Sequence, residues 1–267
     1  MSSQKPVAYR KSFTVEKRKP SFLRRLFPDL GFYISLCSII WRRGQQAKKG
    51  TYTGDDWAIS SNEVIQLLER YGCSLEVTGI ETVAALDGPV VFIGNHMSTL
   101  ETFVLPALIQ PLCDVTFVVK ESLLKYPCFG PILAARKPVT VRRTSPREDL
   151  AAVLDGGSER LAAGRSVIVF PQSTRTSEFN PAHFNTIGVK LARRAGVPVI
   201  PLALKTDAWG NDGKLIKDFG KFDPRKGIHF AFGEKMNISG TGKAEHKFIV
   251  DFIQKNLENW KAQDQLG

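Results

Sequence analysis

The chain has 267 residues, enough to bury the core of one large α/β domain, and its 43% hydrophobic and 24% charged residues are those of an ordinary globular protein. The net charge of +11 is unevenly distributed, because residues 1–50 contain twelve Lys/Arg and two Asp/Glu and the rest of the chain carries only +1. This distribution of charge excludes a uniformly basic protein. It predicts a basic N-terminal arm that binds an anionic surface or partner.

The arm contains an uncharged, bulky run at residues 31–41, which Arg24 and Arg25 precede and Arg42 and Arg43 follow. Its eleven residues are fewer than the about 20 needed to cross a bilayer, and the run begins too far into the chain for a signal peptide. Aromatic and apolar side chains between arginines favour a segment lying in the headgroup layer of a membrane over a core helix with solvated basic flanks. A nucleic-acid-binding arm is disfavoured, since such arms rarely contain a long apolar run.

Beyond the arm, short apolar runs alternate with amphipathic segments. The apolar runs predict strands at residues 90–94, 115–119, 139–141, 167–170, 197–204 and 228–232. Helices are predicted from Ser61 or Asn62 to residue 71 and at residues 100–109, 146–163, 186–195 and 244–260.

This alternation predicts one mostly parallel or mixed sheet with helices on both faces. We expect an arm of residues 1–60, followed by an α/β domain of residues 61–267. Pro198 and Pro201 predict that the strand at 197–204 lies near an edge of the sheet or bends.

The cysteines and histidines suggest no metal site and no disulfide framework. The four cysteines (Cys37, Cys73, Cys113, Cys128) and the four histidines (His96, His183, His229, His246) are too scattered for metal-ligand or redox spacing. A reducing compartment that faces the cytosol fits this pattern.

Candidate site residues directly follow predicted strands. In open α/β sheets the chemistry lies at the carboxyl ends of the strands. His96 follows the strand at 90–94 and Arg175 follows the strand at 167–170. Lys120 closes another strand, and Arg142 and Arg143 follow a fourth, so all of them are expected at the same edge.

His96 and Glu101 could form a base and its orienting group. A histidine can accept the proton of an attacking hydroxyl while a carboxylate holds its other ring nitrogen. Residues five apart diverge by about 140° on a helix, so His96 is expected in the turn before the helix at 100–109. The alternative is a plain capping turn, in which Asn95 or Ser98 caps the helix and His96 is merely exposed.

Arg175 could bind a phosphate group in bidentate fashion, helped by the hydroxyls of Ser173 and Thr174. The alternative for Arg175, as for Arg142 and Arg143, is a solvated surface charge. The chain has no Gly-x-Ser-x-Gly motif, which argues against an α/β-hydrolase nucleophile. Residues 240–244 lack the spacing of a phosphate-binding loop.

Taken together, four blocks resemble the motifs of the glycerolipid acyltransferases, specifically the 1-acylglycerol-3-phosphate acyltransferase family. Residues 95–101 resemble the Asn-His-x4-Asp block, and residues 170–175 resemble Phe-Pro-Glu-Gly-Thr-Arg. Residues 136–142 and 197–201 resemble the second and fourth blocks, in the order of the family.

The resemblance implies that His96 is the general base, that Glu101 takes the place of the orienting aspartate, and that Arg175 and Arg142 bind the phosphate of the acceptor. It also implies that further polar motif residues bind substrate, namely Asn95, Ser98, Lys120, Gln172, Ser173 and Thr174. The implied reaction moves a fatty acyl group from acyl-CoA or acyl-carrier protein to the free hydroxyl of a lysophospholipid, foremost 1-acylglycerol-3-phosphate, and needs no cofactor or metal. The arm resembles the membrane-docking helices of the family, so a peripheral or monotopic protein on the cytoplasmic face is expected.

Three residues depart from the family pattern. Glu101 is one methylene longer than aspartate, Gln172 replaces a glutamate, and Ser173 replaces a glycine and so restricts the backbone. These departures leave two alternatives to the implied reaction. In the first the enzyme acylates a different lipid acceptor, and in the second the protein binds lipid without catalysing a reaction.

Overall fold

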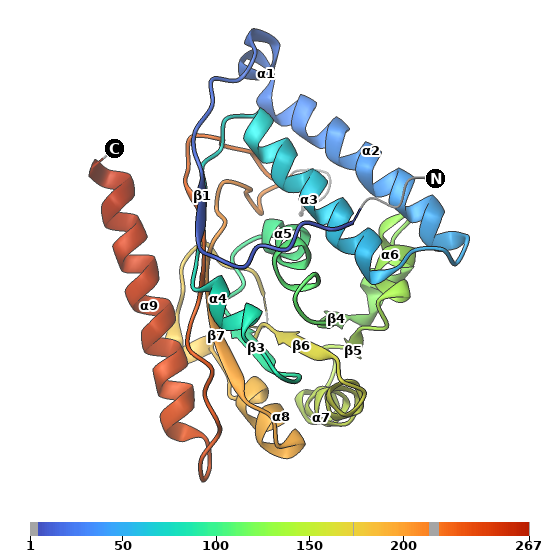
Figure 1. The fold of residues 1–267 in the computed structure, drawn as a ribbon, viewed down its shortest axis with the longest axis vertical. Coiled ribbons are helices and arrows are strands. Elements are labelled where there is room, and N and C mark those ends of the chain that lie inside the picture. Colours follow the sequence, from blue (N-terminus) through green and yellow to red (C-terminus); the bar gives the residue numbers. More distant parts are fainter. Residues whose placement is uncertain (1–4, 173, 214–218, 267) are drawn as a thin grey trace.

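A single mixed sheet forms the centre of the molecule (Figure 1). The computed structural model describes residues 5–172, 174–213 and 219–266, and within them eight strands are ordered β1-β2-β8-β7-β3-β6-β4-β5. The strands are β1 (Phe13–Val15), β2 (Leu75–Thr78), β3 (Val91–Gly94), β4 (Val115–Lys120), β5 (Val139–Val141), β6 (Ser166–Val169), β7 (Val199–Lys205) and β8 (Ile228–Phe232). The β1–β2 and β7–β8 pairs are antiparallel and the other pairs of neighbours are parallel, which confirms the predicted α/β fold.

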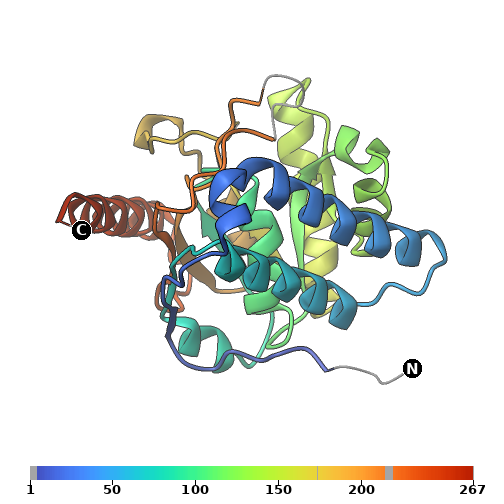
Figure 2. The same cartoon turned by 90° about the horizontal axis from the view of Figure 1, so that it is seen from above.

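Helices cover both faces of the sheet (Figures 1 and 2). The α-helices of the described residues are α1 (Phe22–Leu26), α2 (Pro28–Lys48), α3 (Gly54–Arg70), α4 (Ile80–Ala84), α5 (Leu100–Ile109), α6 (Phe129–Ala135), α7 (Pro146–Ala162), α8 (Ile187–Ala195) and α9 (Lys243–Leu266). Side chains of α2, α3 and α5 join one core cluster, and side chains of α7, α8 and α9 join the cluster on the opposite face. Successive residues of β3 alternate between the two: Val91 and Ile93 face one core and Phe92 the other. This explains why the central strands are uninterrupted apolar runs.

The first predicted helix of the α/β domain begins earlier than expected. Thr53, and neither Ser61 nor Asn62, caps α3, and its side chain and that of Asp56 form a reciprocal capping box. Ser61 is buried inside the helix. The helix therefore runs through the boundary expected at residue 60.

The N-terminal arm packs against the rest of the chain. Phe13–Val15 pair with β2, and α2 packs against α3 and α6. Phe32 of α2 is fully buried, and its ring stacks on that of Phe222 at 3.9 Å between centroids. Residues of the arm and of the following segment thus share one hydrophobic core.

Strand β7 occupies the middle of the sheet, between β3 and β8. Of the two alternatives predicted from its prolines, a place near an edge or a bend, the place near an edge is therefore wrong. The regular ladder with β8 ends at the pair Leu202 and Phe232. Pro201 lies just outside that ladder, where its carbonyl accepts a hydrogen bond from the Gly233 N–H. The missing N–H of Pro201 therefore falls in an irregular stretch between the pair Leu202 and Phe232 and the pair Val199 and Met236.

Candidate active site

The predicted site residues meet at one edge of the sheet. Strands β7, β3 and β6 are parallel neighbours, so their carboxyl ends lie side by side. His96 follows β3, the loop from Phe170 follows β6, and Thr206 follows β7. Three segments that are far apart in the sequence thus build one site, at the place where open α/β sheets carry their chemistry.

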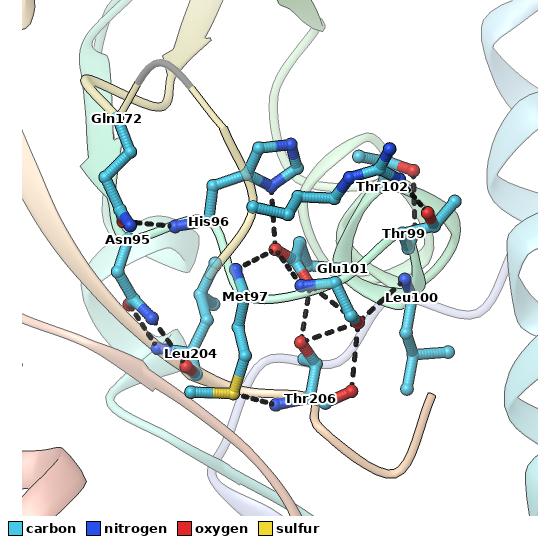
Figure 3. Close-up of polar contacts among 12 residues, drawn as sticks. Asn95, His96, Met97, Thr99, Leu100, Glu101, Thr102, Gln172, Leu204 and Thr206 are labelled. Atoms are coloured by element: carbon cyan, nitrogen blue, oxygen red, sulfur yellow. Dashed lines mark hydrogen bonds and ion pairs between the residues drawn. The ribbon is translucent and has the colours of Figure 1, made fainter. Parts of the chain in front are cut away.

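His96 and Glu101 form a close pair (Figure 3). His96 lies in the turn between β3 and α5, as predicted, and Glu101 lies in the first turn of α5. The His96 Nδ1 and Glu101 Oε1 atoms are 2.8 Å apart. The His96 side chain is 15% exposed and that of Glu101 is fully buried, so the histidine alone reaches the surface.

Glu101 is held by several donors. Its Oε1 accepts hydrogen bonds from the Met97 N–H (2.7 Å) and the Ser98 N–H (3.0 Å), in addition to the contact with His96. Its Oε2 accepts from the Ser98 N–H and from the hydroxyl of Thr206. Burial opposes ionisation, but these hydrogen bonds and the positive charge that His96 can carry outweigh it and hold the pKa of Glu101 below its ordinary value. Glu101 is therefore a carboxylate that can only accept hydrogen bonds.

Contacts from the loop after β6 fix the position of His96. Its ring stacks on Phe170 with 4.4 Å between centroids and 4° between planes. Its backbone N–H donates to Gln172 Oε1 at 2.7 Å, and its carbonyl accepts from the Thr176 N–H at 3.0 Å. The first and third sequence blocks are thereby joined into one rigid unit.

Three residues expected to bind substrate point into the protein instead. Asn95 is buried, and its amide both donates to and accepts from the backbone of Leu204, which ties β3 to β7. Ser98 is buried beneath Glu101. Gln172 is buried and uses its amide nitrogen on the Thr176 hydroxyl. The polar atoms of these side chains are thus engaged in hydrogen bonds within the site.

The cationic residues do not all lie as expected. Arg175 donates to the Thr99 hydroxyl, in the same turn as His96. Arg143 lies close enough to Arg175 that burial, together with the charge of Arg175, lowers the pKa of Arg143. Arg142 is 72% exposed and pairs with Glu121. The charge of Arg175 thus acts on Arg143, whereas the expected Arg142 pairs with Glu121.

Three further residues were expected to bind substrate, namely Lys120, Thr174 and Ser173. Lys120 is exposed at the end of β4, which β6 separates from β3. Thr174 is exposed. Ser173 lies outside the described residues.

Thr206 was not among the predicted site residues, and of the two neighbouring arginines Arg142 was expected to bind phosphate. The signal for Thr206 was its position directly after a buried strand. In Arg143 the backbone φ is +59°, a left-handed conformation that turns the chain between the two arginines and that sequence patterns do not reveal.

Among the described residues, no group of three or more His, Cys, Asp or Glu side chains could hold a metal ion. All four cysteines lie in the described part of the chain and are free thiols.

Comparisons with known proteins agree with the fold and the motifs. A family model described as Acyltransferase matches residues 74–205. A 1-acyl-sn-glycerol-3-phosphate acyltransferase of Pseudomonas aeruginosa is 37% identical over 192 residues, which cover 72% of this chain and 69% of the relative. A protein of the same name from Saccharomyces cerevisiae is 32% identical over 136 residues, or 50% of this chain and 43% of the relative.

The crystal structure of the 1-acyl-sn-glycerophosphate (LPA) acyltransferase of Thermotoga maritima matches with a TM-score of 0.69 at 19% identity and covers 90% of this chain and 97% of that chain. The mixed sheet with its motifs at one edge is thus the fold of an α/β acyltransferase. The chain belongs to the acyltransferase family and is an enzyme of that class, which confirms the resemblance of the four sequence blocks.

Proposed function

We propose that the protein transfers a fatty acyl group from a thioester, acyl-CoA or acyl-carrier protein, to the free hydroxyl of 1-acylglycerol-3-phosphate and so forms phosphatidate. The names of the relatives support the acceptor. The contact of 2.8 Å between His96 Nδ1 and Glu101 Oε1, at the open edge of the sheet, carries the proposal.

Glu101 decides which nitrogen of His96 acts. Because the carboxylate only accepts hydrogen bonds, Nδ1 carries the proton of the shared bond and Nε2 keeps its lone pair. No hydrogen bond within the described residues uses Nε2. This nitrogen is therefore available to the hydroxyl of an acceptor.

In the proposed reaction, Nε2 takes the proton of the acceptor hydroxyl as its oxygen attacks the thioester carbonyl carbon. The tetrahedral intermediate then collapses, the C–S bond breaks, and the imidazolium returns its proton to the leaving thiolate. The products are an ester and a free thiol, and the enzyme ends in its starting protonation state. No metal, cofactor or covalent enzyme intermediate takes part.

The departures from the family pattern are compatible with this chemistry. The longer Glu101 still contacts His96, and Gln172 accepts from the His96 N–H through an oxygen that a glutamate would also supply. These contacts favour catalysis over a lipid-binding homologue without activity.

The proposed reaction is tested by incubating the purified protein with 1-acylglycerol-3-phosphate in anionic vesicles and measuring thiol release from acyl-CoA and from acyl-carrier protein. We expect release with at least one donor, because each presents the same thioester. Monoacylglycerol, which has the hydroxyl but no phosphate, is the matched control acceptor. Equal rates with both acceptors would contradict phosphate recognition, and no release with either donor would contradict the proposed reaction.

Arg175 and Arg143 are proposed to bind the phosphate of the acceptor. Replacement of either by glutamine is expected to raise the acceptor KM about 10- to 100-fold, since a hydrogen bond to a charged group contributes about 1.5–3 kcal/mol. Arg142→Gln is the matched control, because Arg142 is exposed and paired with Glu121. Steady-state kinetics with varied acceptor measures the effect, and an increase with Arg142→Gln alone would contradict this assignment.

The outer surface of α1 and α2 is proposed to dock on the cytoplasmic face of an anionic membrane. Its large apolar side chains are more than half exposed (Phe22, Leu26, Phe27, Leu30, Ile34 and Trp41). A hollow beside α1 has four cationic residues in its lining (Arg18, Lys19, Arg24 and Arg70). Apolar side chains next to a cationic surface fit the headgroup layer of anionic lipids. Among the described residues, no helix is both long enough and apolar enough to cross a bilayer.

Ile34→Glu is expected to weaken binding to anionic vesicles about 10-fold or more, because a buried apolar side chain contributes about 1.5–3 kcal/mol. Ile34 is 61% exposed, so the fold should tolerate the change. Phe248→Glu on α9 is the matched control, since Phe248 is also exposed (46%) but lies on another helix. Vesicle cosedimentation measures the effect, and equal losses for both variants would argue against docking through α2.

A further inference from the structure

Thr206 lies against the carboxylate of Glu101, although it belongs to a distant part of the sequence (Figure 3). It directly follows β7 and is fully buried. Its hydroxyl contacts Glu101 Oε2, the oxygen that faces away from His96, and also the Ser98 hydroxyl at 2.9 Å. Because β7 is the parallel neighbour of β3, its carboxyl end brings Thr206 to the same edge as His96.

The backbone of Thr206 is held on both sides by the His96 turn. Its N–H contacts Met97 Sδ at 3.3 Å, and its carbonyl accepts from the Ser98 hydroxyl at 2.9 Å. The position of the Thr206 side chain therefore does not depend on its own hydroxyl. A valine of the same shape should occupy the same place.

The direction of the hydrogen bond between Thr206 and Glu101 follows from the charge of Glu101. A carboxylate supplies no proton, so in the contact between the Thr206 hydroxyl and Glu101 Oε2 the hydroxyl is the donor. The Ser98 hydroxyl lies 3.2 Å from the same oxygen and 2.9 Å from both the carbonyl and the hydroxyl oxygen of Thr206.

We propose that Thr206 is a positioning residue, whose hydroxyl holds Glu101 Oε2 so that Oε1 stays at His96 Nδ1 and fixes the tautomer of the imidazole. The inference rests on the proposed role of His96 as the base. His96 and the N–H groups of Met97 and Ser98 hold Oε1, and the Thr206 hydroxyl completes the hydrogen bonding of Oε2, so the carboxylate keeps one orientation.

The experiment compares Thr206→Val, which removes the hydroxyl and keeps the shape, with Thr206→Ser, which keeps the hydroxyl. Thr206→Val is expected to lower kcat about 10- to 100-fold with the KM of the acceptor unchanged, because loss of orientation affects the chemical step. Thr206→Ser should stay close to the wild type. In a Glu101→Gln background, Thr206→Val should cost little more, since the hydroxyl acts through that carboxylate.

A kcat of Thr206→Val within about twofold of the wild type would overturn the inference, and so would equal losses in the serine variant or losses that multiply in the double variant. His96→Ala separates this outcome from a failure of the proposed base. If His96→Ala is inactive while Thr206→Val is fully active, only the inference fails. If His96→Ala is fully active, the proposed base itself is wrong.

The tautomer of His96 gives a readout that needs no turnover. In ¹⁵N-histidine NMR spectra the wild type should show His96 protonated at Nδ1, whereas Thr206→Val should show a mixture of the two neutral tautomers. An unchanged tautomer in the valine variant would overturn the inference whether or not acyl transfer is measured.

Discussion

His96→Ala is expected to lower the kcat of acyl transfer by a factor of about 10²–10⁴, the usual contribution of a positioned general base. The variant removes the only group of the His96–Glu101 pair that reaches the surface. Glu101 keeps its hydrogen bonds from Met97, Ser98 and Thr206, so the fold should persist. Thiol release under saturating substrates measures the effect, and circular dichroism checks the fold.

His183→Ala is the matched control for His96→Ala. His183 is exposed, and no hydrogen bond between described residues joins it to the His96 turn. We expect the control to retain the kcat of the wild type. Wild-type turnover in a folded His96→Ala protein would contradict the proposed base.

Phe32→Ala is expected to lower the free energy of unfolding by about 3–5 kcal/mol, the range for truncating a buried aromatic ring. Phe32 is fully buried, stacks on Phe222 and meets Trp209 and Tyr71 edge to face. The cavity would open inside the core that the arm shares with the rest of the chain. Denaturant unfolding measures the change.

Ile34→Ala on the same helix is the control for Phe32→Ala. Ile34 is 61% exposed, so its truncation should change the stability by less than about 0.5 kcal/mol. Similar small effects of both variants would indicate that the arm contributes little to the folded core. A large effect at Phe32 alone would establish that α2 is part of that core.

The apolar patterns of the sequence predicted the helix after His96 and the strand before it closely. The helix after His96 has the predicted bounds, Leu100–Ile109, and the strand before it was predicted to within one residue. The pattern failed for α3, where Ser61 or Asn62 was predicted as the cap and the true cap is Thr53, the residue before the helix. Serine and threonine both cap helices, and only burial tells which one does so.

The arm illustrates a different limit of the sequence. Its aromatic and apolar residues fitted both a membrane segment and a core helix. The structure places Phe32 and Leu36 in the core, while Leu30 and Ile34 face outward. The composition of a helix does not separate these two sets, because which side is buried depends on what packs against it.

By itself the sequence determined that His96 and Arg175 follow buried strands and therefore lie at the functional edge of an α/β sheet. It also determined the family, because four blocks in order depend on local residue identity, and the comparisons confirm it. Tertiary structure alone decided the order of the strands, and with it the approach of Thr206 to Glu101. The physical reason is that the pairing of β3 with β7 brings together residues 105 positions apart, through contacts that no local pattern encodes.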